Sequence, residues 1–137
     1  MGSQGRGPVA PLLAGCRIVL LEAHILVALD CQDGLIEAGA HSVDIVNSAT
    51  EALQRMQTGQ VDAAIVDIDL GQPAGIAAVE AMAATGVPLV VASAYTPAGP
   101  LPAAIPFVAK PYRLQELIAA LAEVLAQRGE PDGPAST

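Results

Sequence analysis

The sequence is poor in aromatic and basic residues, and each shortage excludes a class of protein. One phenylalanine, two tyrosines and no tryptophan occur among 137 residues of which 53% are hydrophobic, so the core has to be aliphatic. Six lysines and arginines stand against fourteen aspartates and glutamates, for a net charge of −8. This balance repels nucleic-acid phosphates and anionic lipid, so we expect neither nucleic-acid nor membrane-surface binding. The length suits a single globular domain.

Long hydrophobic runs and cysteine frameworks are also missing. No stretch approaches the roughly 18 apolar residues of a membrane-spanning helix. Cys16 and Cys31 are too few for a disulfide framework and lack metal-type spacing. Leu13-Ala-Gly-Cys16 resembles a lipobox, but the apolar stretch there covers only residues 8–13 and contains two prolines. It is shorter than the apolar region of a secretory signal, which has about 7–15 residues. We therefore expect a cytoplasmic protein.

Short apolar runs alternate with helical patterns along most of the chain. The runs predict strands at 18–21, 42–46, 63–67, 87–92 and 107–110. Apolar spacing predicts helices at about 25–38, from the capping box at 48–51 onwards, at about 76–84 and at about 113–127. Four prolines between residues 97 and 106 make a fourth helix before the last strand short or irregular. We expect a flexible N-terminal arm at 1–15, the folded domain at 16–128 and a polar tail at 129–137.

This alternation predicts a doubly wound, flavodoxin-like α/β fold with a five-stranded parallel sheet. The second run is the least apolar and suits an edge strand, which favours the strand order 2-1-3-4-5. Ligands of such sheets bind where the order reverses, at the C-terminal ends of the strands. Glu22 and Asp67 follow the first and third strands there, and Ser93 and Lys110 follow the fourth and fifth. Two carboxylates, a hydroxyl and an ammonium suit a phosphoryl group and a divalent cation.

With these motifs in this order, residues 17–128 resemble the response-regulator receiver domains of two-component signalling. The matching pieces are RIVLLE at 17–22, DAAIVDIDL at 62–70, LVVASAY at 89–95 and FVAKPY at 107–112. The resemblance implies that Asp67 is the phosphoacceptor, Ser93 the switch hydroxyl, Phe107 the switch aromatic and Lys110 the phosphate-binding lysine, with a cis bond to Pro111.

The same resemblance implies a bacterial signalling role, in a phosphorelay or a simple two-component system. The partner would be a histidine kinase or a histidine phosphotransferase, and the chain would be no enzyme beyond self-catalysed phosphoryl acceptance and autodephosphorylation. The output partner, the stimulus and the oligomeric state, including a homodimer, stay open.

The resemblance also implies a Mg²⁺ ion held by Glu22, Asp67 and the backbone carbonyl of Asp69. The chain departs from the family at Ala23, where an acidic metal ligand normally stands. Alanine offers no oxygen, and the imidazole of His24 is a poor ligand for a hard cation. We therefore expect weakened or lost Mg²⁺ binding and slower phosphorylation.

Other functions and simpler roles are left open. The chain could be a pseudo-receiver that docks a protein without phosphorylation, or a small flavodoxin-like nucleotide or flavin binder, although no glycine-rich phosphate loop follows the first strand. The simpler roles are a capping carboxylate for Asp67, solvated loop carboxylates for Glu22 and Asp69, a strand-closing hydroxyl for Ser93 and a core side chain for Phe107.

Overall fold

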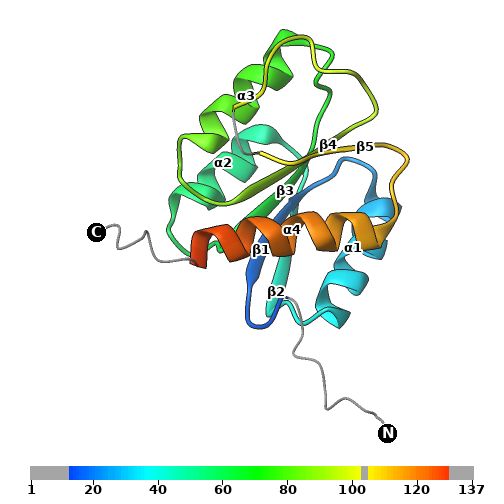
Figure 1. Ribbon diagram of the computed structural model, residues 1–137, viewed down its shortest axis with the longest axis vertical. Coiled ribbons are helices and arrows are strands. Elements are labelled where there is room, and N and C mark those ends of the chain that lie inside the picture. Colours follow the sequence, from blue (N-terminus) through cyan, green and yellow to red (C-terminus); the bar gives the residue numbers. More distant parts are fainter. Residues whose placement is uncertain (1–12, 103–104, 130–137) are drawn as a thin grey trace, which may run out of the picture.

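A computed structural model describes residues 13–102 and 105–129, which form one parallel sheet with helices on both faces (Figure 1). The strands are β1 (Arg17–Leu21), β2 (Ser42–Val46), β3 (Ala63–Asp67), β4 (Leu89–Ser93) and β5 (Phe107–Ala109). The helices in the described part are α1 (Ile25–Glu37), α2 (Ala49–Gln57), α3 (Pro73–Ala83) and α4 (Leu114–Gly129). All neighbouring strands are parallel, in the order β2-β1-β3-β4-β5. The predicted fold class and strand order are confirmed.

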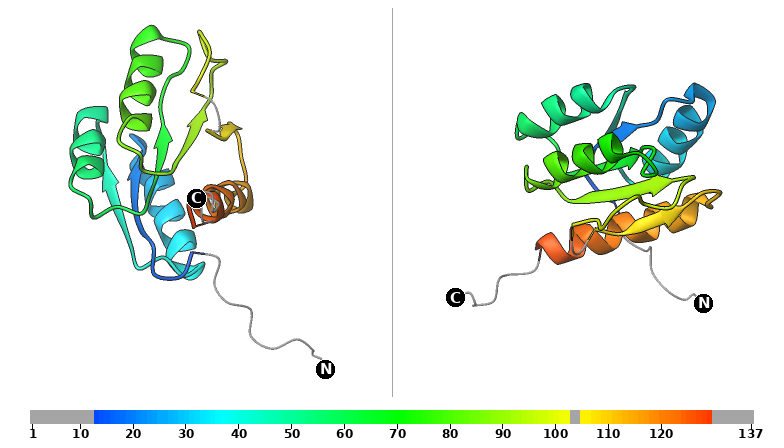
Figure 2. Two further views of the ribbon diagram at one scale, coloured as in Figure 1. Left: turned by 60° about the vertical axis from the view of Figure 1, so that its left-hand side comes forward. Right: turned by 90° about the horizontal axis from the view of Figure 1, so that it is seen from above.

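The core has two layers because the central strands are apolar on both faces. α1 and α4 cover one face of the sheet, and α2 and α3 cover the other (Figure 2). Along β1, Ile18 and Leu20 pack in the first layer, whereas Val19 and Leu21 pack in the second. Burial on both sides explains why this strand is a continuous apolar run rather than an alternating one.

Two local signals set the helix starts on the second face. The Ser48 hydroxyl accepts a hydrogen bond from the Glu51 N–H at 3.1 Å, so Ser48 is the predicted N-cap of α2. α3 begins at Pro73, three residues before the predicted start at Ile76. Proline suits the first helical position, because its missing N–H would have no acceptor there. The helix predicted at about 76–84 was therefore placed too late in the sequence.

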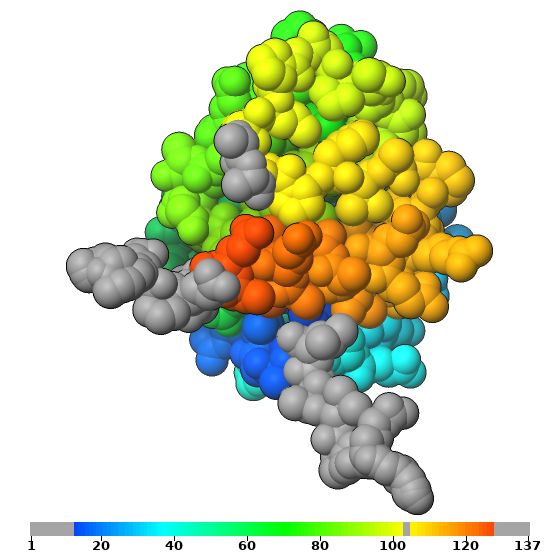
Figure 3. Space-filling model, viewed as in Figure 1, coloured from blue at the N-terminus to red at the C-terminus, as the bar shows by residue number. Residues whose placement is uncertain are grey.

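The connection between β4 and β5 contains no helix in its described residues, 94–102 and 105–106, as its prolines predict. The Ala98 N–H donates to the Leu70 carbonyl at 2.7 Å, and Leu101 and Ile105 pack against the core on the α2–α3 side. Figure 3 shows this connection (yellow) beside α4 (orange to red). None of the helices in the described part is long and apolar enough to cross a membrane.

The folded part begins earlier than predicted. Leu13 is fully buried, and its N–H donates to the Ala38 carbonyl at 3.1 Å. Gly15 N–H bonds to the Gly39 carbonyl in the same way. Residues 13–15 thus belong to the packed domain rather than to the expected arm, and the rest of that arm, residues 1–12, lies outside the described residues. So does 130–137 of the expected tail, whereas Gly129 closes α4.

Gly75→Ala is expected to destabilise the fold. A Cβ at this position would lie 2.0 Å from the backbone carbonyl oxygen of Asp69, which cannot rotate away as a side chain could. Overpacking of this kind costs about 1–3 kcal/mol, and urea denaturation would measure it. Gly99→Ala is the matched control, because nothing lies within 4 Å of its added Cβ. Equal stabilities of the two variants would contradict the close approach.

Candidate functional site

The register of the parallel strands brings the predicted site residues to one edge of the sheet. Leu21 of β1 pairs with Val66 of β3, so Glu22 and Asp67 follow side by side. The last pair of β4 and β5 is Ser93 with Ala109, which puts Lys110 directly beyond the same edge. The peptide bond from Lys110 to Pro111 is cis, as the resemblance implied.

Glu22, Asp67 and Lys110 form one half-buried cluster of charges. The Lys110 ammonium lies 2.5 Å from an Asp67 carboxylate oxygen and 3.6 Å from Oε1 of Glu22. The Glu22 and Asp67 side chains are only 6% and 14% exposed, so Glu22 turns inward and is not a solvated loop carboxylate. The His24 N–H donates to the second Glu22 oxygen at 2.9 Å and fixes its direction. No pattern in the sequence indicated this backbone contact.

The two carboxyls have pKa values shifted in opposite directions. Burial raises the pKa of Asp67 to about 6, the neighbouring Glu22 carboxyl adds to the rise, and Lys110 opposes it. Burial would also raise the pKa of Glu22, but hydrogen bonds with Asp67 and the His24 N–H, together with the Lys110 charge, bring it below its ordinary value. The first proton taken up by this pair therefore goes to Asp67, the predicted nucleophile.

Ser93 connects two loops at the same edge. Its side chain is fully buried, and its hydroxyl oxygen accepts hydrogen bonds from the Leu70 N–H at 3.2 Å and the Tyr95 N–H at 3.1 Å. Ser93 therefore does more than end a strand: it holds the loop after β3 and the connection after β4 together. Phe107 is 39% exposed, so it is not a core side chain, and its switch role stays a prediction.

The cluster offers only some of the oxygen ligands that a divalent cation needs. Oε1 of Glu22 is buried without a hydrogen-bond partner and faces the cluster, as a cation ligand would. The Asp69 side chain is exposed and accepts the Gly71 N–H at 2.8 Å, so only its carbonyl, packed against Gly75, is left as a ligand. Within the described residues no three histidine, cysteine or carboxylate side chains could hold a metal together. The donor set suits a weakly held Mg²⁺, and that ion stays a prediction.

Asp67→Asn is expected to raise the free energy of unfolding at neutral pH in the presence of a chelator. The pKa of Asp67 is about 6 in the fold against an ordinary 3.8, so its contribution to stability falls as pH rises through this window. The difference corresponds to ~3 kcal/mol, of which a neutral isostere should recover roughly 1–3 kcal/mol. Urea denaturation at neutral pH and around pH 4 measures the gain, which should vanish at the lower pH. Asp69→Asn, in the exposed loop, is the matched control. If Asp67→Asn leaves the free energy of unfolding unchanged, Lys110 fully offsets the cost of burying the ionised Asp67 carboxylate.

No protein-family model and no curated protein matches the chain. Solved structures do. A response regulator receiver protein from Sinorhizobium medicae WSM419 aligns with a TM-score of 0.72 at 24% identity, over 83% of this chain and 97% of that one. The PhyR response regulator REC domain of Erythrobacter litoralis gives 0.66 at 20% identity, over 86% and 95% of the two chains. The N-terminal domain of a response regulator/sensory box/GGDEF protein from Carboxydothermus hydrogenoformans gives 0.63 at 22% identity, over 82% and 95%. The chain therefore has the fold of response-regulator receiver domains.

Proposed function

We propose that this protein is a signalling receiver that accepts a phosphoryl group on Asp67. The observation that carries the proposal is the contact of 2.5 Å between the Lys110 ammonium and the Asp67 carboxylate, at the C-terminal edge of the sheet and beside a buried Glu22. In this proposal the protein works in the bacterial cytoplasm, with a histidine kinase or histidine phosphotransferase as donor.

The proposed step is an in-line transfer from a phosphohistidine. An Asp67 oxygen forms a bond to phosphorus, the bond from nitrogen to phosphorus breaks, and the imidazole leaves with the electron pair and takes a proton from water. Lys110 neutralises the charge that three phosphoryl oxygens bring beside two carboxylates. The Ser93 hydroxyl proton is free to be donated, because its oxygen acts only as an acceptor in the bonds to Leu70 and Tyr95. Mg²⁺, when held by Glu22, Asp67 and the Asp69 carbonyl, would add positive charge at the same oxygens.

The start of α1 supports a protein donor rather than a small molecule. Ile25, Leu26 and Leu29 are 58%, 69% and 44% exposed, and α1 begins three residues after Glu22. Large exposed aliphatic side chains next to a charged cluster are typical of a surface that another protein covers. We assign this surface to the histidine-bearing partner, whose phosphoryl group has to reach Asp67.

A pseudo-receiver is the second candidate, and Ala23 is the observation that favours it. Position 23 supplies no oxygen, and Lys110 already neutralises one of the two carboxylates. Such a protein would keep the fold and dock its partner without phosphorylation. The crevice between β1 and β3 holds the charged cluster rather than a glycine-rich loop, so a flavin or nucleotide binder is not favoured.

Incubation with acetyl phosphate and Mg²⁺ tests the proposal directly. We expect intact-mass spectrometry to find one added phosphoryl group on the wild type and none on Asp67→Asn, because only a carboxylate can form the acyl phosphate. A Lys110→Met variant should be phosphorylated more slowly, since it leaves the developing charge uncompensated. A folded wild type without adduct at any Mg²⁺ concentration would favour the pseudo-receiver.

Ala23→Asp is expected to tighten Mg²⁺ binding about tenfold or more, because it adds a charged oxygen ligand at the pocket. Phosphorylation should accelerate in the same variant. Isothermal titration with Mg²⁺ measures the affinity, and Ala23→Asn provides a control of the same size without the charge. An Ala23→Asp variant that binds Mg²⁺ no better than the wild type would show that Glu22 alone sets the metal site.

A further inference from the structure

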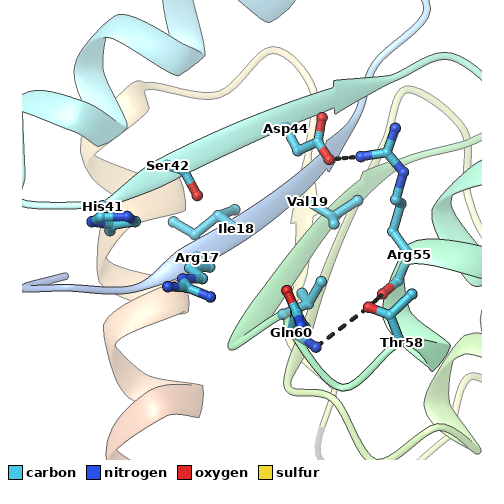
Figure 4. Close-up of a pocket in the computed structure, with 10 residues that line it drawn as sticks. Arg17, Ile18, Val19, His41, Ser42, Asp44, Arg55, Thr58 and Gln60 are labelled. Atoms are coloured by element: carbon cyan, nitrogen blue, oxygen red, sulfur yellow. Dashed lines mark hydrogen bonds and ion pairs between the residues drawn. The ribbon is translucent and has the colours of Figure 1, made fainter.

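A second cavity lies at the opposite end of β1 from the charged cluster. It has a volume of about 570 Å³ and opens between the starts of β1 and β2 and the end of α2 (Figure 4). Its polar lining includes Arg17, His41, Ser42, Asp44, Arg55 and Gln60. The volume falls in the range of about 300–1,000 Å³ that is usual for small-molecule sites.

The alternation of the two strands makes this cavity polar. Ile18 and Val43 point to the core under α1 and α4. Their neighbours Arg17, Ser42 and Asp44 therefore point to the other face, which α2 covers. Because α2 has only nine residues, it leaves the start of the sheet open on this face.

The two arginines of the cavity lining differ in what they contact. Arg55 is already engaged, by an ion pair with Asp44 on β2 and by another with Glu51 at 3.5 Å. The Arg17 backbone N–H donates to Asp62 at 2.8 Å, but within the described part of the chain the Arg17 guanidinium has no ion-pair partner. Arg17 and His41 lie at the same end of the cavity in Figure 4. In a chain of net charge −8, an exposed arginine that lines a cavity and has no ion pair among the described residues is a local attraction for an anion.

The remaining lining suits a ligand larger than a bare ion. The Ser42 hydroxyl and the Gln60 amide are hydrogen-bonding groups at the wall, and Val19 and Val61 add apolar surface. Asp44, held by Arg55, closes the far end and would repel a second negative group. A compact molecule with an anionic group at one end and a neutral polar body fits this distribution.

We propose that this cavity binds a small organic oxyanion, a phosphorylated or carboxylated metabolite-sized molecule whose anionic group pairs with Arg17. The site is separate from the phosphoryl-accepting cluster, because Arg17 and Glu22 lie at opposite ends of β1. A ligand here would act on the protein independently of the chemistry at Asp67.

Amide NMR of the ¹⁵N-labelled full chain tests the proposal, with glycerol 3-phosphate and malonate as probes at constant ionic strength. We expect saturable shifts of the backbone amides around Arg17, His41 and Gln60, and no comparable shifts around Asp67. Stronger binding of one probe would assign the anionic group to the phosphate or the carboxylate class.

Arg17→Gln should lower the affinity for the tighter-binding probe about tenfold or more, since a charge-assisted hydrogen bond is lost. It keeps the backbone contact to Asp62, and its unshifted amides elsewhere would show an intact fold. Arg113→Gln, at the start of α4 and outside the cavity, removes the same charge and should leave binding unchanged. Shifts that stay linear with concentration for both probes, or an affinity that Arg17→Gln and Arg113→Gln change equally, would overturn the proposal.

Discussion

The candidate site depends on one ammonium group placed beside a buried and a partly buried carboxylate. Glu22 and Asp67 lie side by side because their strands are neighbours in register, and burial makes the ionised form of each costly. Without Lys110, the pKa of Asp67 would rise further, and less of its carboxyl would be in the ionised, nucleophilic form. Even with Lys110 present, burial and Glu22 keep the pKa of Asp67 as high as about 6. The reactivity of the site therefore rests on β5 delivering Lys110 to the end of β3, and thus on the complete strand order.

The surrounding loops are tied to this cluster by main-chain contacts. Ser93 accepts N–H groups from Leu70 and Tyr95, and Ala98 donates to the Leu70 carbonyl, so the loop after β3 and the connection after β4 are held as one unit. If Ser93 turned toward a phosphoryl group on Asp67, Leu70 and Tyr95 would lose their acceptor. The connection after β4 contains no helix in its described residues. It could therefore change conformation after that loss without breaking helical hydrogen bonds.

The sheet and the functional groups at its C-terminal edge were predictable from the sequence, whereas individual hydrogen bonds and packing contacts were not. Apolar runs located the strands, and the less apolar second run indicated the strand order. The predicted strand ends then placed four side chains at one edge of the sheet: Glu22, Asp67, Ser93 and Lys110. The inward turn of Glu22 was not predictable, because it depends on a backbone N–H from His24 that any residue would supply. The early start of α3 at Pro73 and the burial of Leu13 were missed for a related reason: a Gly/Pro-rich composition indicates loop, and only tertiary packing decides otherwise.

Whether the protein is a working receiver or a pseudo-receiver depends on the net charge of the cluster. Above the pKa of Asp67, two carboxylates and one ammonium leave a single net negative charge. Oε1 of Glu22 makes no hydrogen bond and lies 3.6 Å from the Lys110 ammonium, so it is the oxygen most available to a cation. A divalent cation gains less from one net charge than from the two that an acidic residue at position 23 would supply. Lys110 thus has opposite effects on the two steps: it lowers the pKa of Asp67 and neutralises an incoming phosphoryl group, but it also repels the cation that would assist transfer. A chain with Ala23 therefore depends more on Lys110 for charge compensation than one with a second acidic ligand would.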